Sequence, residues 1–348
     1  MPYSLHSMQR RPTSFDIAAL AGVSQPTVSR ALSGNPSVSA DTRARVLAAA
    51  EQLNYKVDKN ASSLRRQHSK TLALLFFEEP SSDGALINPF YLSMLGPMVR
   101  CCAKRGYDLL ISFQQLSSDW HVDYEDSRKA DGIILLGYGD YREHRPKLLA
   151  LLERETHFVR WGPADKLSIG PTICSDNEQG GFDATQHLIA NGRRRIAFIG
   201  TATSAYPEFL DRWRGYCRAL SAHGLDADVA LRADAEPDEA EGRAAVADLM
   251  SRGIEFDAIF AASDMAAIGA MHALQNLGRK IPDEVAIIGF DDIPAASLSS
   301  PPLSTMRQDA RGAGEALIDV LLRSIEGEEV SGRLLPVRLI VRESSASS

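Results

Sequence analysis

The sequence of 348 residues has few cysteines and no long apolar run, and these absences exclude several classes of protein. Four cysteines are too few for a disulfide scaffold, and none has the Cys-x-x-Cys spacing of zinc or redox sites. The longest apolar runs, such as 72–77, have the length of strands, far below the roughly 20 residues of a membrane-spanning helix. The first residues lack the apolar stretch of a signal peptide. We therefore expect a globular protein of the cytoplasm.

Signatures of catalysis and metal binding are also missing. The eight histidines form no His-x-x-x-His or His-Glu-x-x-His arrangement. The phosphate-binding, dinucleotide-binding and hydrolase motifs G-x-x-x-x-G-K-[ST], G-x-G-x-x-G and G-x-S-x-G do not occur. The acidic pair Asp291-Asp292 has no further ligands at a recognisable spacing. The sequence thus favours a binding protein over an enzyme and predicts no metal and no cofactor.

Charge is distributed unevenly along the chain. Residues 1–70 hold ten Lys and Arg against four Asp and Glu, a net charge of +6, so the other residues carry −13 of the total of −7. A basic head on an acidic body suits a protein that brings only one end to a polyanion such as DNA. A merely solvated basic face is the alternative.

The basic head carries signals for three short helices. Thr13 lies three residues before Asp16, a capping box that opens a first helix, and Gly22 favours the left-handed conformation that ends it. Ser24 can cap a second helix, where Pro26 is tolerated because N–H groups of the first turn have no partner within the helix.

A third helix is predicted over 41–53, capped by Ser39. Four apolar residues are expected to pack it against the other two helices: Val46, Leu47, Ala50 and Leu53. Two short helices at an angle, supported by a third, make a helix-turn-helix in a three-helix bundle. We predict a flexible tail over 1–11 and this DNA-binding headpiece over 12–57.

The residues of the headpiece resemble a known family. The string from Asp16 to Leu32, DIAALAGVSQPTVSRAL, with VSADTR at 38–43 and LNY at 53–55, is similar to the headpiece of the LacI/GalR family of bacterial repressors. In physical terms, the start of the second helix can face base edges, and its hydroxyls can bond phosphates. The alternative is that Ser and Thr only cap and that Arg30 is solvated. The candidate DNA contacts are Thr13, Ser24, Gln25, Pro26, Thr27, Ser29 and Arg30.

Residues 58–70 are predicted to be a hinge. The stretch is polar and basic, and alone it is typical of a linker. In the family, the resemblance implies a segment that becomes helical on operator DNA and wedges a leucine into the minor groove, here Leu64, with Asn60 and Ala61 beside it. Many members have proline where this chain has Val57, so the start of the hinge is less well defined than its leucine.

From residue 71 onward, apolar strands alternate with helices. Repeated βα units predict parallel sheets covered by helices on both faces, and two such runs predict two doubly wound subdomains. The expected strands are 72–77, 107–113, 131–136, 157–161, 195–199, 257–262 and 285–290, and the expected helices are 90–104, 142–154, 177–190, 209–223, 238–252 and 265–277.

The body, 71–348, is similar to the effector-binding domain of the same family, which resembles periplasmic sugar-binding proteins. Supporting strings include RRIAFIG at 194–200 and IGFDD at 288–292. The resemblance implies three crossings between the subdomains, which we place so that 71–162 joins 292–325 and 163–291 joins 326–348. The break near 162–175 is rich in Gly, Pro and Ser.

Ligands of such sheets bind beyond the carboxyl ends of the strands. Acids and a guanidinium can bond sugar hydroxyls in pairs, and an aromatic side chain can cover an apolar ring face. Each aromatic residue alone has packing as its alternative role. Ser263 stands where sugar-binding members often have asparagine. The resemblance gives the effector candidates as Phe90, Tyr91, Tyr138, Asp140, Trp161, Arg212, Ser263, Asp264 and Asp291.

Together these features predict a DNA-binding transcription repressor of carbohydrate genes. It binds a pseudo-palindromic operator as a homodimer, because the C-terminus has no heptads for a tetramer. A small effector, expected to be a sugar, changes the subdomain angle and so the operator affinity. A purine- or nucleoside-responsive co-repressed regulator of the same fold stays open as an alternative. A solute-binding protein without DNA binding is opposed by the basic head.

Overall fold

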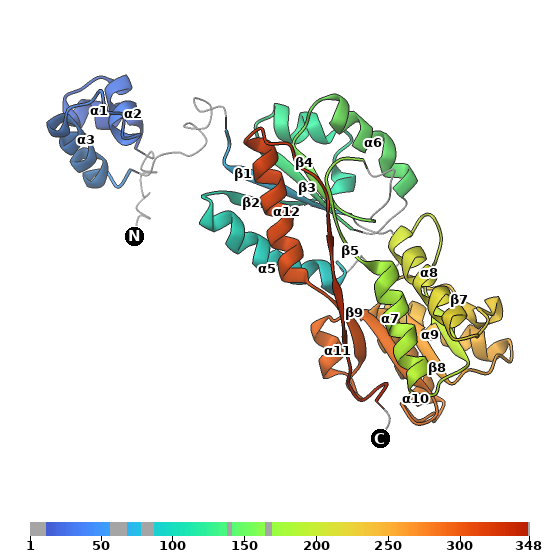
Figure 1. Ribbon diagram of the computed structural model, residues 1–348. Coiled ribbons are helices and arrows are strands. Elements are labelled where there is room, and N and C mark those ends of the chain that lie inside the picture. The colour runs from blue at the N-terminus through green and yellow to red at the C-terminus, as the bar shows by residue number, and fades with distance from the viewer. Residues whose placement is uncertain (1–11, 56–67, 78–86, 138–140, 164–168, 347–348) are drawn as a thin grey trace, which may run out of the picture. The chain divides into compact units, whose positions relative to one another are not determined.

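The computed structural model of the protein describes residues 12–55, 68–77, 87–137, 141–163 and 169–346. The chain divides into two compact units, Met1–Ser69 and Lys70–Ser348. Figure 1 shows both, with the small helical unit in blue. Among the described helices, none is both long and apolar enough to cross a membrane.

The small unit contains α1 (Ser14–Ala21), α2 (Gln25–Leu32) and α3 (Ala40–Gln52). Thr13 forms the expected capping box, since its backbone N–H donates to Asp16 Oδ2 at 2.7 Å. Gly22 ends α1 with φ +63°, and Ser39 caps α3 by accepting the Thr42 N–H at 3.2 Å. The predicted helix-turn-helix is therefore confirmed.

The core of the small unit differs from the expectation at one position. Ile17, Val28 and Val46 are fully buried where the three helices meet. Leu47 was expected in this core, but it is 51% exposed, and Ala49 is buried in its place. The inward face of α3 follows the spacing i, i+3, i+4 from Val46, which turns position 47 toward solvent.

The first sheet of the large unit has six described strands in the order β11-β5-β4-β3-β1-β2, and all pairs are parallel. The strands are β1 (Thr71–Phe76), β2 (Asp108–Phe113), β3 (Gly132–Leu136), β4 (Phe158–Trp161), β5 (Thr172–Ser175) and β11 (Arg333–Leu335). The helical elements on this sheet are α5 (Pro89–Lys104), η1 (Gln114–Leu116), η2 (His121–Asp126), α6 (Tyr141–Glu153) and α12 (Ala310–Ile325).

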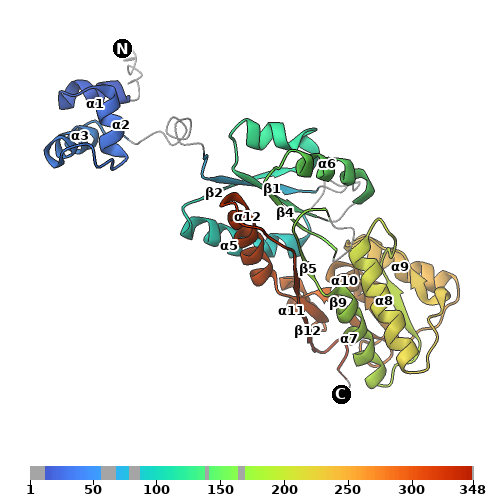
Figure 2. The same ribbon diagram turned by 45° about the horizontal axis from the view of Figure 1, so that its top comes forward.

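Alternating residues of the strands cover the two faces of this sheet. Ala73 and Leu75 of β1 pack with Trp120, Tyr124 and Leu148, on the side of η2 and α6. The intervening residues of β1 belong to the other apolar cluster, on the side of α5 and α12, which pack side by side (Figure 2). This period of two, with both faces buried, explains why the central strands β1 and β3 are apolar almost throughout.

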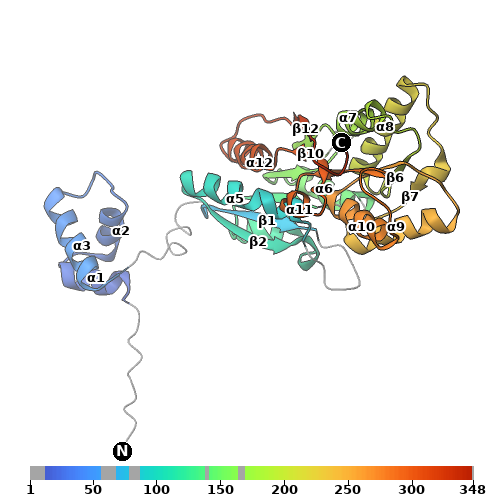
Figure 3. The ribbon, with the colours of Figure 1, turned by 90° about the horizontal axis from the view of Figure 1, so that it is seen from below.

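The second sheet has six described strands in the order β12-β10-β9-β8-β6-β7, and only the β10–β12 pair is antiparallel. The strands are β6 (Ile196–Ile199), β7 (Arg232–Ala233), β8 (Ala258–Ala261), β9 (Ala286–Asp291), β10 (Ser304–Gln308) and β12 (Val337–Ile340). The associated helices are α7 (Asn177–Ala190), α8 (Pro207–Ala222), η3 (Val229–Leu231), α9 (Glu239–Ser251), α10 (Asp264–Asn276) and α11 (Pro294–Leu298). The pairs α7–α8 and α9–α10 pack closely, and Figure 3 shows the second pair side by side. Two doubly wound sheets were predicted, and both are present.

The chain crosses between the sheets three times, but at other points than expected. It crosses after β5, after β10 and after β11, the last visible as the dark red chain that descends from α12 in Figure 1. Residues 172–175 and 333–335 therefore lie in the first sheet, and 304–308 in the second, so the expected boundaries at 162, 291 and 325 are displaced. The Gly- and Pro-rich stretch at 162–171 connects β4 to β5 within one sheet, and β5 has too few apolar residues to be recognised as a strand.

Candidate functional site

The candidate DNA contacts of the small unit lie along α2, at Ser24 just before it, and at Thr13 just before α1. Ser24, Pro26 and Arg30 are exposed, whereas Val28 on the opposite face is buried in the core. The polar face of α2 is therefore available to a ligand, while its apolar face fixes the helix to α1 and α3.

Hydrogen bonds order the side chains at the start of α2. Gln25 Nε2 donates to Ser14 Oγ at 3.2 Å, which ties the first residue of α2 to the start of α1. The hydroxyls of Ser24 and Thr27 lie 2.8 Å apart. Ser24 was expected to cap α2 through a backbone N–H, but its hydroxyl bonds Thr27 instead. Asn60, Ala61 and Leu64 of the predicted hinge lie outside the described residues.

In the large unit, polar side chains from four elements meet at the carboxyl ends of β9 and β10. Asn177 begins α7, Arg212 lies in α8, Asp291 ends β9 and Gln308 ends β10. Each of these four residues is at least 95% buried. A buried polar cluster at the carboxyl edge of a doubly wound sheet lies where this fold class binds ligands.

Arg212 is the centre of this cluster. Its Nε donates to Asn177 Oδ1 at 2.8 Å, and its Nη1 donates to the carbonyl of Ala262. Its guanidinium lies 3.7 Å from the ring centroid of Phe290. Nη2 is 3.8 Å from Asp291 Oδ1, an ion pair without a direct hydrogen bond. A guanidinium fixed in this way presents its charge in one direction.

Burial also shifts the pKa values of the acids in this region. Burial raises the pKa of Asp291 to about 7, against the opposing effects of Arg212 and of the Gln308 amide, which donates to Asp291 Oδ1 at 2.6 Å. Burial, and next the charge of Asp291, raise the pKa of Asp264 well above its usual range. Acids with such shifts are typical of functional sites, although structural networks also produce them.

Ser263 and Asp264 are fully buried and bonded within the protein. The Ser263 hydroxyl caps α10 by accepting the Ala266 N–H at 3.2 Å. Asp264 accepts the Thr305 hydroxyl at 2.6 Å and the Ile293 N–H at 2.9 Å. Asp264 therefore holds the segment that follows β9 through Oδ2 and the strand β10 through Oδ1.

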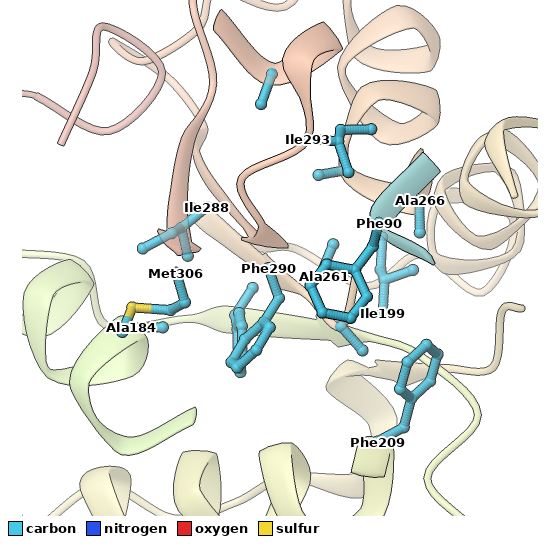
Figure 4. Close-up of a cluster of buried hydrophobic side chains, with 14 of the residues drawn as sticks. Phe90, Ala184, Ile199, Phe209, Ala261, Ala266, Ile288, Phe290, Ile293 and Met306 are labelled. Atoms are coloured by element: carbon cyan, nitrogen blue, oxygen red, sulfur yellow. The ribbon is translucent and has the colours of Figure 1, made fainter. Parts of the chain in front are cut away.

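The aromatic candidates belong to the apolar core in this structure. Phe90, Tyr91 and Trp161 are each at most 5% exposed, and the ring centroids of Phe90 and Trp161 lie 5.5 Å apart. Figure 4 shows Phe90 of α5 in the same apolar cluster as Phe290 of β9 and Phe209 of α8, so this cluster joins the two subdomains. Tyr138 and Asp140 lie outside the described residues.

Three buried polar residues were not predicted. Asn177 and Gln308 hold Arg212 and Asp291 directly, and Glu208 of α8 is 4% exposed. Burial raises the pKa of Glu208, with Arg212 and Arg160 acting in the opposite direction. In the sequence, all three resemble caps or loop residues, and only the assignment of β10 would have placed Gln308 beside Asp291.

Two glycines allow the helix that carries Arg212 to approach its neighbour. A Cβ on Gly215 of α8 would lie 2.0 Å from the carbonyl oxygen of Glu178 in α7. A Cβ on Gly181 of α7 would lie 2.1 Å from the carbonyl oxygen of Arg212. The backbone contact of α7 and α8 therefore fixes the distance between Asn177 and Arg212.

Comparison with known proteins gives matches in both units. The signature described as "Bacterial regulatory proteins, lacI family" matches residues 15–58, and that of a "Periplasmic binding protein-like domain" matches 185–345. Within the described residues, no group of three His, Cys, Asp or Glu side chains is arranged to hold a metal ion.

Similar proteins cover nearly the whole chain. The HTH-type transcriptional regulator CelR of Thermobifida fusca is 32% identical over 97% of this chain and 99% of its own length. The ribose operon repressor of Escherichia coli K12 is 30% identical over 96% of this chain and 99% of its own length. A solved structure described as a transcriptional regulator CelR–cellobiose complex is 30% identical, with a TM-score of 0.71, and the match covers 96% of this chain and all of that one.

Proposed function

This chain belongs to the lacI family of bacterial regulatory proteins, and we propose that it is a transcription repressor whose affinity for operator DNA is controlled by a sugar. The observation that carries the proposal is the combination of an exposed recognition helix with a buried arginine–aspartate cluster in a second unit. The first suits DNA, and the second suits a small polar molecule.

The DNA-binding role is supported by the geometry of α2. Its first turn offers the partly exposed Gln25 and its last turn the exposed Arg30, side chain types that bond base edges and phosphates. Thr13, Ser24, Pro26, Thr27 and Ser29 complete the proposed contact surface. Asn60, Ala61 and Leu64 of the hinge remain proposed DNA contacts on the basis of the family resemblance.

The effector site is proposed around Arg212 and Asp291. A ring hydroxyl can accept a hydrogen bond from Nη2 of Arg212 and donate one to Oδ1 of Asp291, two atoms that lie 3.8 Å apart. Asp140 and Tyr138 follow β3 in the sequence and are proposed as contacts from the first subdomain. Ser263 and Asp264 are proposed to support the site through its backbone.

A sugar is the effector that the relatives favour. The similar solved structure is a complex with cellobiose, and a relative of 30% identity is named for the ribose operon. Sugars combine hydroxyls with apolar ring faces, and Phe90, Tyr91 and Trp161 lie in the cluster that joins the subdomains. A purine that stacks on the same rings is the alternative to be tested.

Control of DNA binding by the effector requires two copies of the chain. We propose a homodimer, since a pseudo-palindromic operator needs two headpieces. In support, α5 leaves Leu92 and Val99 exposed seven residues apart on one face. The regulator acts in the cytoplasm, where chromosomal DNA is, and it acts by binding rather than by catalysis.

The proposal is tested by a ligand screen of the purified protein. Cellobiose, other disaccharides, ribose and purines are added separately, and the melting temperature and calorimetric heat are measured. We expect a sugar to stabilise the fold by binding the native state. If only a purine stabilises the fold, the purine alternative replaces the sugar. The role as a repressor is tested separately, by selecting bound sequences from random DNA, and a protein that binds none of them would not be a repressor.

A further inference from the structure

The turn that carries Asp291 has a backbone conformation that L-amino acids avoid. Asp291 has φ +120° and Asp292 has φ +58°. Two consecutive non-glycine residues persist there only where surrounding contacts determine the conformation. These contacts therefore decide where the Asp291 carboxylate lies.

Arginines from two different segments hold both carboxylate oxygens of Asp292. Oδ2 accepts a hydrogen bond from Arg307 Nε at 2.6 Å, and Oδ1 accepts one from Arg342 Nη2 at 2.6 Å. Arg307 lies in β10, whereas Arg342 follows β12 in the C-terminal segment. The side chains of Asp292 and Arg342 are 8% and 18% exposed, so this contact is largely shielded from water.

The C-terminal segment is itself fixed against the second sheet. Ser344 Oγ donates to the carbonyl of Ile287 at 2.6 Å and accepts the Ser304 N–H at 2.8 Å. Arg342 Nη1 also donates to the carbonyl of Leu303 at 2.7 Å. The pairing of β12 with β10 fixes the backbone before Arg342, and the bonds of Ser344 fix it after Arg342. The guanidinium therefore approaches Asp292 from a determined direction.

We propose that Arg342 is a positioning residue for effector recognition. By holding Asp292, it keeps the strained turn in the conformation that directs Asp291 toward Arg212 and Gln308. Without Arg342, the turn relaxes toward negative φ, and the Asp291 carboxylate loses its place. This inference rests on the proposed function, because it takes Asp291 and Arg212 as part of the effector site.

The test compares variants of the full-length chain. Arg342→Ala removes the contact, and Arg342→Lys keeps one charged donor. Arg338→Ala is the matched control, since Arg338 is an exposed arginine on the neighbouring β12. Asp291→Asn tests the proposed site itself. For each protein, cellobiose affinity is measured by calorimetry, and operator affinity without sugar is measured by fluorescence anisotropy.

We expect Arg342→Ala to weaken cellobiose binding by about tenfold or more, the usual effect of misplacing a charged hydrogen-bonding group. Operator affinity should stay within about threefold, because the headpiece is a separate unit. Arg342→Lys should recover most of the sugar affinity, and Arg338→Ala should bind as the natural chain does.

Three results would overturn the inference. If Arg342→Ala melts at a lower temperature but binds cellobiose normally while Asp291→Asn does not, Arg342 only stabilises the fold. If neither variant changes binding, the proposed effector site fails as well. If the natural chain does not bind cellobiose, crystal structures of the natural chain and of Arg342→Ala are compared. The inference requires that Arg342→Ala change φ at 291–292 and break the Asp291–Gln308 bond. An unchanged turn contradicts it.

Discussion

The proposed DNA-binding face and the buried polar cluster proposed as the effector site, here called the effector cluster, are assembled in different ways. The described candidates for DNA contact fall within residues 13–30, on one helix and the ends beside it. The effector cluster takes Asn177, Arg212, Asp291 and Gln308 from four elements that are far apart in the sequence. The first site is local and exposed, and the second is long-range and buried.

This difference determines how each site responds to substitution. Side chains such as Ser24 and Arg30 project into solvent, so their loss changes binding with little effect on folding. Arg212 is 1% exposed and bonded on several sides, so its removal leaves buried polar partners unsatisfied. Isosteric variants are therefore needed to separate recognition from stability in the large unit.

Removal of the small unit should separate DNA binding from sugar binding most completely. A chain of residues 70–348 keeps both sheets and the effector cluster but lacks α1–α3. We expect it to bind the sugar normally and to lose operator binding by about a thousandfold or more, to the level of non-specific DNA or below. Anisotropy and calorimetry measure the two affinities. Retained operator binding would mean that the division of roles is wrong.

The next effect concerns the contact of α7 with α8. Gly215→Ala places a methyl group against the backbone of Glu178, so the two helices must separate. We expect a loss of about 3 kcal/mol in the free energy of unfolding, at the upper end of overpacking effects. Denaturant titration measures it. Ser221→Ala, on the exposed surface of the same helix, is the control. Gly224→Ala is unsuitable as a control because φ is +70° at that position. Equal losses of stability in Gly215→Ala and Ser221→Ala would refute the role of this contact.

Asp291→Asn changes recognition with little change of volume. It removes the charge opposite Arg212 and one acceptor for a ligand hydroxyl. We expect sugar affinity to fall by roughly 10- to 100-fold, the value of a charged hydrogen bond, with operator affinity unchanged. Calorimetry measures the sugar affinity. Asp226→Asn, at an exposed position outside the cluster, serves as the control.

The predicted hinge can be tested for its contribution to specific DNA binding. A leucine that wedges into a base step offsets unstacking by the contacts that a bent duplex permits. Leu64→Ala should therefore reduce operator affinity by about tenfold and affinity for random DNA much less. Competition experiments give both values. Equal losses would mean that the segment acts only as a tether.

The smallest expected effect is a dependence of sugar binding on pH. Burial raises the pKa of Asp291 to about 7 from an ordinary value of 3.8, so the stability that its protonated form contributes is present below pH 3.8 and is lost as pH rises toward 7. A sugar that donates hydroxyls to the ionised carboxylate should bind up to about tenfold more tightly at pH 8 than at pH 6. Asp291→Asn should remove this dependence.

How far the sequence predicts the structure also differs between the two regions. The capping box of Thr13 and Asp16, the left-handed Gly22 and the spacing of Ile17, Val28 and Val46 are local patterns, and the headpiece follows them closely. The exposed Leu47 is an exception that depends on a rotation of one residue around α3.

In the large unit, most strands and helices up to 290 were predictable, except the short strands β5 and β7, whereas the crossings between the sheets were not. They depend on which sheet a short strand joins, and β5 and β10 carry polar residues among their few positions. Arg212 and Asp291 were identified through the family resemblance, but Asn177, Gln308 and Glu208 were not, because their partners lie far away in the sequence. Burial of a polar side chain is a property of the fold and not of its neighbours in the chain.

The central claim is that a sugar bound in the large unit controls DNA binding by the small one. The most direct test is the anisotropy of a labelled operator with the full-length chain, titrated with cellobiose, in parallel with Asp291→Asn. We predict that the sugar changes the operator affinity of the natural chain by about tenfold or more, and that the variant needs about 10- to 100-fold more sugar for the same change. An operator affinity that no sugar alters, or an equal response of both proteins, would contradict the account.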